Sequence, residues 1–470
     1  MSPEAILSRR SLIRVGSLGI GGLALPDLLK AAEVPGGATG RAKRCVLFFL
    51  DGGPAQMDLW DMKPEAPDIV RGPFRPIATQ VPGLQVCEHL PMLARSIHRM
   101  ALIRSVHHTI VDHNAGAYYA LTGRNPATGS TLIVRDQPEN FPCFGSVVAQ
   151  LRRTPTIPEF VHVPEIMFNN GDEIPGERAG FLGPAFDPLV SGDPSAPDYR
   201  VPGLSLPQSS SLDRIELRRQ LLHRLDLSAG TLQDDPHAES LGTHYQKAFS
   251  LITSTETRKA FRVDLEPMTI RERYGLPDRV DRSVEARKFG GLPHLGQSLL
   301  LCRRLLEAGV QLITCCTGRR IDQTWDGHRQ HFSLMKKSIL PYFDRALSAF
   351  LDDLDDRGLL EDTLVVVMGE FGRTPKIGQI TSNAGATEEG RDHWPHCYTV
   401  LMAGAGINRG AIYGASDREA AYPISKPVTP EDIAATIYET LGVPPETLIT
   451  DQLSRPHVVA TGRVISELFS

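Results

Sequence analysis

The stretch Leu364–Val400 reads LVVVMGEFGRTPKIGQITSNAGATEEGRDHWPHCYTV. It begins with a short apolar run rich in valine, Leu364–Met368, which predicts a strand that is buried on both faces, as in a parallel sheet. A second apolar run, Tyr398–Ala403, predicts another strand of the same sheet. The segment between them carries these titratable side chains: Glu370, Arg373, Asp392, His393 and His396. Because ligands of open α/β sheets bind beyond the strand ends, this segment predicts a binding site.

Other apolar runs predict further strands of this sheet, at Cys45–Leu50, Ala101–Val106 and Val310–Cys316. Each run is followed by polar residues that can bind ions: Asp51, then His107, His108, Asp112, His113 and Asn114, then Asp326 and His328. Amphipathic helical patterns alternate with the runs, at Leu292–Ala308, Ser338–Leu354 and Pro430–Leu441. This alternation predicts an α/β fold with a central, mostly parallel sheet.

The polar residues at the strand ends have the chemistry of metal ligands, since Asp, Glu and His bind Zn²⁺ and similar divalent ions. Asp326 and His328 can both reach one ion if the loop turns at Gly327. For Asp51, which precedes two glycines, a metal or phosphate site and a plain Asp-Gly turn are equally good interpretations.

The composition of the 470 residues is that of an ordinary globular protein, with 41% hydrophobic and 22% charged residues. The formal net charge of −5 gives no indication of nucleic-acid binding. No stretch is long and apolar enough to predict a stable membrane span. The 7 cysteines are scattered without a CxxC spacing, so neither a disulfide framework nor a cysteine-based zinc site is predicted.

The N-terminus predicts an export signal. The sequence Ser8-Arg9-Arg10-Ser11-Leu12 contains paired arginines, and a weakly apolar segment and small residues follow. Paired arginine indicates the twin-arginine export machinery and a periplasmic or extracellular location. A disordered basic arm is the alternative. We therefore predict a signal peptide and linker at residues 1–40 and one α/β domain at 41–470. That domain has an irregular insertion at about 125–290, with helices at Leu212–Leu227 and Ser240–Phe261.

Several motifs resemble one known family. The patterns FLDGGPAQMD, Trp-Asp-x-His, GEFGRTPK and GRDHWP resemble the DUF1501 family of exported proteins of uncharacterised function. LDDLDDRGLLEDTLVVVMGEFGR, LTGR at 121–124 and DIAATIYETLGV are similar to segments of sulfatases and the wider alkaline-phosphatase superfamily. The resemblance covers nearly the whole chain after residue 40. It implies an alkaline-phosphatase/sulfatase-like fold, with helices on both faces of the central sheet.

The resemblance also implies a metal centre, with Zn²⁺ preferred over Ca²⁺, Mg²⁺ or Mn²⁺. The ligands expected from it are Asp51, Asp326, His328, Glu370 and His393, with Asp112 or His113 as further candidates. Two positions depart from the superfamily pattern. His113 stands where the nucleophilic Cys, Ser or Thr is expected, and Phe371 follows Glu370 where a metal-binding side chain is usual.

Three functions remain open, and we favour the first. The chain is an exported metal-dependent hydrolase of sulfate, phosphate or related esters, and a sulfated carbohydrate is one candidate substrate. In it, His113 would act as nucleophile or general base, and Arg373 would clamp a substrate oxygen. Alternatively, the chain keeps the metal but serves in binding or at the cell surface. In the third interpretation, the His/Asp cluster is an acid–base site without metal.

Overall fold

The computed structural model describes residues 40–126, 135–154, 157–201, 252–277, 292–321 and 324–469, together with isolated residues between 204 and 249. The predicted helix at Leu212–Leu227 and the predicted export segment lie mostly or wholly outside these ranges. Of the predicted helix at Ser240–Phe261, the described C-terminal part contains α10 (Thr255–Ala260), which begins anew after the N-cap Ser254. Among the described residues, no helix has both the length and the apolar character that a membrane crossing requires.

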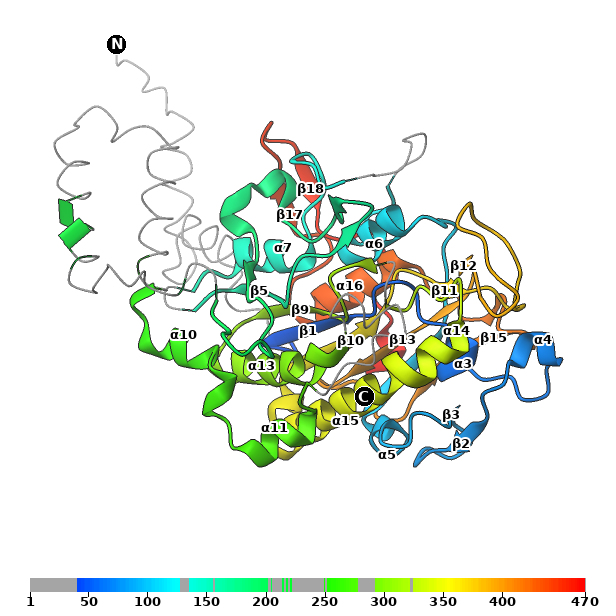
Figure 1. The fold of residues 1–470 in the computed structure, drawn as a ribbon. Coiled ribbons are helices and arrows are strands. Elements are labelled where there is room, and N and C mark those ends of the chain that lie inside the picture. Colours follow the sequence, from blue (N-terminus) through cyan, green and yellow to red (C-terminus); the bar gives the residue numbers. More distant parts are fainter. Residues whose placement is uncertain are drawn as a thin grey trace, which may run out of the picture. The chain divides into compact units, whose positions relative to one another are not determined.

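The described chain is built around one sheet of 8 strands in the order β14-β4-β13-β10-β1-β9-β5-β8 (Figure 1). Its strands are β1 (Arg44–Phe49), β4 (Met100–Val106), β5 (Phe160–Val163), β8 (Leu189–Val190), β9 (Leu312–Cys316), β10 (Thr363–Met368), β13 (Tyr398–Ala403) and β14 (Ile412–Tyr413). All neighbouring pairs are parallel except the two that involve β13. The mostly parallel sheet is therefore confirmed.

Strand β1 shows why the central strands read as continuous apolar runs. Val46 and Phe48 pack in one hydrophobic cluster, whereas Leu47 and Phe49 pack in the other. Successive side chains of a strand point to opposite faces, so a strand with helices on both sides needs apolar residues at every position.

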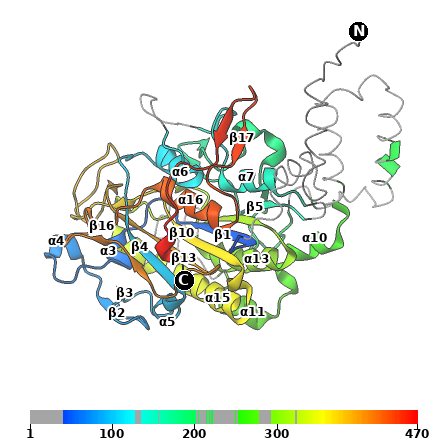
Figure 2. The ribbon, with the colours of Figure 1, turned by 180° about the vertical axis from the view of Figure 1, so that it is seen from behind.

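Helices cover both faces of the sheet (Figures 1 and 2). On one side lie α5 (Leu93–Ser96), α11 (Met268–Tyr274), α13 (Leu295–Ala308) and α15 (Leu340–Asp356), and on the other lie α6 (His113–Thr122), α7 (Phe144–Leu151) and α16 (Pro430–Thr440). The predicted helices at 292–308, 338–354 and 430–441 correspond to α13, α15 and α16. Thr429 and Asp432 form a capping box that begins α16.

The region expected to be irregular, about 125–290, contributes to the central layers. Strands β5 and β8 join the sheet next to β9, and α7 packs against β5 and β9. Other short elements are the helices α3 (Gln56–Leu59), α4 (Asp68–Arg71), α10 (Thr255–Ala260) and α14 (His331–Leu334). Five two-stranded antiparallel sheets are also present among the described residues: β2–β3 (76–78, 85–87), β6–β7 (168–169, 172–173), β11–β12 (372–373, 393–394), β15–β16 (415–416, 423–425) and β17–β18 (448–450, 456–458).

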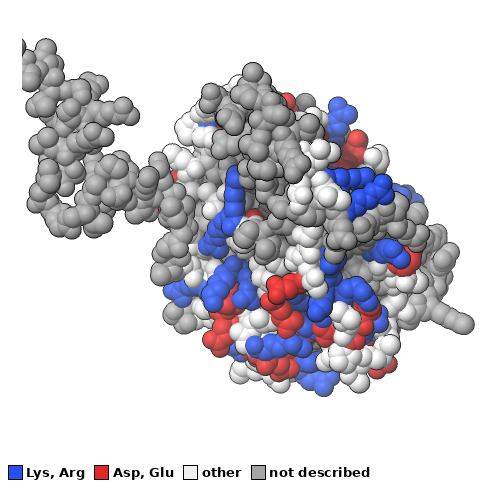
Figure 3. All heavy atoms as spheres, turned by 90° about the vertical axis from the view of Figure 1, so that its left-hand side faces the viewer, with Lys and Arg blue, Asp and Glu red and all other residues white. Residues whose placement is uncertain are grey.

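Charged side chains of both signs intermix on the face shown in Figure 3. Many of the charges that α11, α13 and α15 carry are paired. For example, Arg303 contacts Asp353 at 3.0 Å and Glu266 at 2.9 Å. Such mixed pairs form no single-sign surface along these helices.

Candidate metal centre

The direction of β13 brings loops from distant parts of the chain to one edge of the sheet. Strands β1, β9, β10 and β4 run parallel and present their carboxyl ends there, whereas β13 runs against them and presents its amino end. The segment before β13 therefore reaches the same place as the segments after the parallel strands. This is how His393, on β12, meets residues from the loops after β4 and β9.

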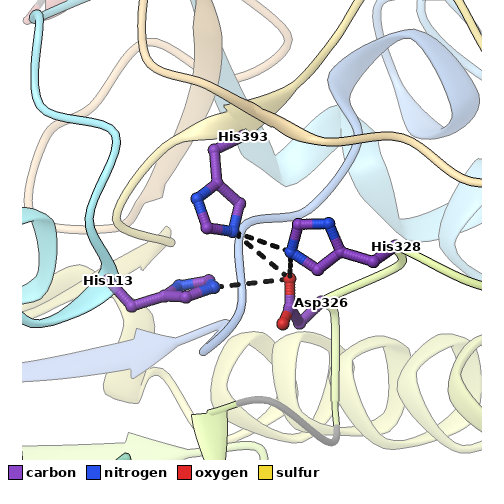
Figure 4. Close-up of side chains that lie close together, drawn as sticks. All are labelled: His113, Asp326, His328 and His393. Carbon is purple, nitrogen blue, oxygen red and sulfur yellow. Dashed lines mark hydrogen bonds and ion pairs between the residues drawn. The ribbon is translucent and has the colours of Figure 1, made fainter. Parts of the chain in front are cut away.

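Four side chains converge at this edge: His113, Asp326, His328 and His393 (Figure 4). One nitrogen or oxygen atom from each lies within 4.8 Å of the others. Asp326 Oδ1 lies 2.8 Å from His328 Nε2, 3.3 Å from His113 Nε2 and 3.5 Å from His393 Nε2. The Nε2 atoms of His328 and His393 are 2.9 Å apart. Ligands of a tetrahedral ion held at about 2.0–2.1 Å lie roughly 3.3 Å from one another, so the spacing suits a single ion.

The other ring nitrogen of each histidine is held by an acceptor. Nδ1 of His113 lies 2.6 Å from Glu370 Oε1, and Nδ1 of His393 lies 2.5 Å from the Val111 carbonyl oxygen. Nδ1 of His328 contacts the Gly385 carbonyl oxygen. A carbonyl or carboxylate oxygen only accepts, so each Nδ1 must donate a proton and each neutral ring turns a lone pair at Nε2 toward the centre. Metal-binding histidines are oriented in the same way.

One of these inward-facing nitrogens is left without a hydrogen bond. His113 Nε2 is buried and has no hydrogen-bond partner among the described residues, although Asp326 is close. Burying an unpaired polar atom costs free energy. A cation among the Nε2 atoms would remove that cost.

Arg373 lies beneath the cluster and not at its surface. Its side chain is fully buried, and Nη2 lies 2.5 Å from Asp326 Oδ1. Its other bonds go to main-chain carbonyl oxygens, including that of Gly53 at 2.9 Å from Nε. Burial raises the pKa of Asp326, but Arg373 and His113 outweigh it and hold the pKa well below its usual range. Arg373 thus fixes an ionised Asp326, and the geometry gives no support to the predicted substrate clamp.

Glu370, predicted as a metal ligand, contacts His113 from outside the cluster and is not one of the four converging side chains. It accepts from the Gly52 main-chain nitrogen at 2.9 Å and from His113 Nδ1. Burial lowers the pKa of His113, but Asp326 and Glu370 together raise it to about 9. Burial and the neighbouring His113 lower the pKa of His393 to about 3. Without an ion, one proton on His113 would therefore partly balance the carboxylates.

Asp51, also predicted as a ligand, is not among the four converging side chains. Its Oδ1 accepts from the Thr317 main-chain nitrogen at 2.8 Å, the Thr317 hydroxyl at 2.5 Å and the Gly318 nitrogen at 3.0 Å. Its Oδ2 accepts from the Thr324 hydroxyl at 2.6 Å. Burial, together with the charge of Glu370, raises the pKa of Asp51 to about 7 despite the hydroxyl bonds. Asp51 is satisfied by protein donors and ties the loop after β9 to β1.

Phe371 stands at the sequence position where the resemblance to sulfatases implied a metal-binding residue, and its ring packs against the cluster. Its ring centre lies 4.7 Å from that of His393 and 5.0 Å from that of His113. An apolar ring supplies no ligand and keeps water from the histidines. The donor atoms of the cluster are therefore those of its three imidazoles and one carboxylate, which is the number that one ion requires.

The remaining candidates have structural partners. Asp112 caps α6 through the Ala115 nitrogen, and Asp392 accepts from Thr381, Ser382 and His393. His108 donates to the Glu370 carbonyl oxygen at 2.7 Å and accepts from Ile110 at 3.0 Å. His396 packs against Trp394 and Tyr422. Neither His107 nor His396 belongs to the described cluster.

Of the four side chains in the cluster, His113 was the hardest to assign to a metal site from the sequence alone. Its position at the start of a helix, directly after a predicted strand, is the same kind of signal that identified Asp326 and His328. The second ring nitrogen, which Glu370 holds from 257 residues away, could not be read from spacing.

The fold and the cluster define the class of this protein: an α/β protein with a candidate three-histidine, one-carboxylate metal centre at the edge of its sheet. The chain belongs to the DUF1501 family, described as a protein of unknown function, which matches residues 42–469. No curated protein matches it.

Solved structures similar to this chain include sulfatases and alkaline phosphatases. A protein of glycosaminoglycan metabolism from Bacteroides thetaiotaomicron is 12% identical, with a TM-score of 0.41 over 91% of this chain and 76% of that chain. A Pseudoalteromonas sulfatase, PsFucS1, is 12% identical, with a TM-score of 0.33 over 88% and 70%. The alkaline phosphatase of the Antarctic bacterium TAB5 is 14% identical, with a TM-score of 0.32 over 81% and 96%. These likenesses are distant, and no substrate or residue role follows from them.

Proposed function

We propose that this chain is a hydrolase of sulfate, phosphate or related esters that depends on one divalent metal ion. The ligands are His113, Asp326, His328 and His393. One observation carries the proposal: three imidazoles turn Nε2 toward the same carboxylate oxygen while each Nδ1 is held by an acceptor. Lone pairs that face one another at such distances repel, and a metal cation among them would relieve the repulsion at all four atoms.

The donor set favours Zn²⁺. Three nitrogens and one oxygen suit Zn²⁺, whereas Ca²⁺ and Mg²⁺ take mainly oxygen ligands. Mn²⁺ accepts imidazole and carboxylate as well, and it is the main competitor. The charges at the centre also favour a cation, because the carboxylates of Asp326 and Glu370 both contact His113, while Arg373 contacts Asp326.

The protein residues have defined parts in this proposal. Glu370 keeps the proton on Nδ1 of His113, and Arg373 keeps Asp326 ionised and in place. A divalent ion here would acidify a water molecule and neutralise charge on an anionic ester. Because His113 Nε2 faces Asp326 at the centre of the cluster, we assign His113 as a ligand and not as a nucleophile, so a water molecule would supply the oxygen that attacks the ester.

A binding role is the second candidate. The observation that favours it is the number of ligands: four protein ligands fill a tetrahedral site, which is the pattern of structural zinc. His328 is the most exposed of the four, with 13% of its side chain accessible, so substrate access would have to come from its side.

The test is hydrolysis of aryl sulfate, aryl phosphate and phosphodiester substrates by purified protein, with and without chelator, beside the variant His328→Ala. We expect turnover that chelator abolishes, that Zn²⁺ restores and that the variant lacks. Metal binding without turnover on any ester would favour the binding role. Turnover that survives both chelator and His328→Ala would contradict the proposed site.

We also propose that the chain is exported by the twin-arginine machinery, on the evidence of Arg9 and Arg10 and the apolar segment after them. Fractionation of cells that express the full chain or the double variant Arg9→Lys, Arg10→Lys tests this. Export of the wild type alone is expected, and equal export of both would contradict it.

A further inference from the structure

A buried carboxylate outside the cluster joins two of the three segments that carry the proposed metal ligands. Asp58, on α3, is fully buried and contacts Arg391 and His331, which are also buried. Arg391 binds it through both carboxylate oxygens: Nε lies 2.7 Å from Oδ2, and Nη2 lies 3.0 Å from Oδ1. His331 Nε2 lies 2.9 Å from Oδ2.

Both partners of Asp58 are close to metal ligands along the chain. His331 begins α14, three residues after His328, and Arg391 stands two residues before His393. Elements α3 and α14 lie side by side in Figure 1. One carboxylate thus holds the loop with Asp326 and His328 and the loop with His393.

Main-chain bonds lock the two loops to each other around this point. The Arg391 nitrogen donates to the Gly327 carbonyl oxygen at 3.0 Å, and Gly327 lies between two ligands. The Thr387 nitrogen donates to the His328 carbonyl oxygen at 3.0 Å. Side chains at 327 and 390 are excluded, because a Cβ at 327 would overlap the His331 ring and one at 390 would overlap the His328 carbonyl group.

Arg373 connects Arg391 with the proposed ligand Asp326. The Arg391 carbonyl oxygen accepts from Arg373 Nη1 at 3.2 Å, and Arg373 Nη2 holds Asp326. Burial raises the pKa of Asp58, but Arg391 and His331 lower it below its usual value, so Asp58 is ionised. The Asp58–Arg391 ion pair is buried from solvent.

We propose that Asp58, with Arg391 and His331, is a positioning group that sets the distance between the ligand pair Asp326/His328 and the ligand His393. Its effect is on metal affinity and ligand geometry, and it makes no contact with the ion or substrate. This inference rests on the proposed metal centre. Changes to groups that orient metal ligands commonly cost about 10–100-fold in affinity.

The control is a buried carboxylate of similar surroundings elsewhere. Asp353 on α15 accepts from Tyr274 at 2.8 Å, contacts Arg303 at 3.0 Å and accepts from Arg357 at 2.8 Å. None of these residues lies within two positions of a ligand. Asp353→Asn should therefore destabilise the fold while leaving the metal centre unchanged.

The experiment compares Asp58→Asn, His331→Gln and Asp353→Asn with the wild type in two ways. Titration with Co²⁺, followed by its visible absorption, reports affinity and ligand geometry. Imidazole NMR signals of the metal-free protein report the surroundings of His328 and His393 and need no metal. His331→Gln removes only the contact between His331 and Asp58 and keeps the Asp58–Arg391 pair. It therefore tests the proposal even if Asp58→Asn fails to fold.

We expect Co²⁺ affinity to fall about 10–100-fold, with an altered spectrum, in the Asp58 and His331 variants and to stay unchanged in Asp353→Asn. The signals of His328 and His393 should shift in the first two only. If the wild type binds no Co²⁺, the proposed function fails, and the NMR comparison still decides the positioning role. Unshifted signals in a folded His331→Gln, or equal shifts in Asp353→Asn, would overturn it.

Discussion

Asp51 is a buried carboxylate and Asp326 a largely buried one at the same edge of the same sheet, and their surroundings are opposite. The oxygens of Asp51 accept hydrogen bonds from the hydroxyls of Thr317 and Thr324 and from main-chain nitrogens. Asp326 Oδ1 faces Arg373 on one side and three imidazole nitrogens on the other. Protein donors satisfy the first carboxylate, whereas our proposal places a cation beside the second. A buried acid at a strand end is therefore a metal ligand only if protein donors leave its lone pairs free.

The largest expected effect separates these two carboxylates directly. Apparent zinc-binding free energies of about 10–16 kcal/mol, shared by four ligands, give about 2.5–4 kcal/mol for each. Asp326→Ala should therefore weaken Zn²⁺ binding by roughly 100-fold or more, as measured by competition with a chromophoric chelator. Asp51→Asn is the matched comparison and should bind Zn²⁺ within a few-fold of the wild type. Equal losses of Zn²⁺ affinity in both variants would contradict the assignment of Asp326, and not Asp51, as a metal ligand.

Removing the ion should lower stability by a smaller amount. A ligand at 100 times its dissociation constant stabilises the native state by about 2.7 kcal/mol. We expect the Tm of the chelated protein to rise by several degrees when Zn²⁺ is restored, and that rise should be absent in Asp326→Ala. Differential scanning calorimetry measures both, and an equal rise in the variant would place the ion elsewhere.

A pH effect should follow from Asp51. Its pKa is about 7 in the native state, above the ordinary value of 3.8, so the folded protein holds this proton more tightly than the unfolded chain. The contribution to stability is complete below about pH 4 and is lost as the pH rises to 7, by up to about 1.4 kcal/mol per pH unit.

Urea unfolding of the metal-free protein at pH 5 and pH 8 measures this slope. The wild type should lose more stability between the two values than Asp51→Asn, which has no carboxylate to ionise. Identical slopes would mean that Asp51 is charged throughout.

The smallest effect is expected for His396. Its ring packs against Trp394 and Tyr422 and is not among the converging side chains. His396→Ala should leave Zn²⁺ affinity unchanged within error. A clear loss would show that the centre extends beyond the four ligands.

Local sequence patterns predicted most of the strands and helices of the fold. Apolar runs at 45–50, 101–106, 310–316 and 364–368 and helical patterns such as 292–308 predicted elements that the structure contains. The reversed direction of β13 was not predictable, because an apolar run is the same read in either direction. That reversal is what places His393 at the site.

The ligand set was harder to predict than the sheet. Asp326, His328 and His393, which were predicted as ligands from their places at strand ends, lie together in the cluster. Asp51 and Glu370 have the same pattern, and what distinguishes them are partners hundreds of residues away: Thr317 and Thr324 for Asp51, and His113 for Glu370. The number of remote donors that a carboxylate receives is decided by tertiary structure alone.

X-ray absorption spectroscopy of the Zn²⁺-loaded protein is the most direct test of the metal centre. The account predicts one zinc per chain with three imidazole nitrogens and one carboxylate oxygen at about 2.0–2.2 Å. A protein that retains no zinc, or a zinc shell that lacks the imidazole signal, would contradict it.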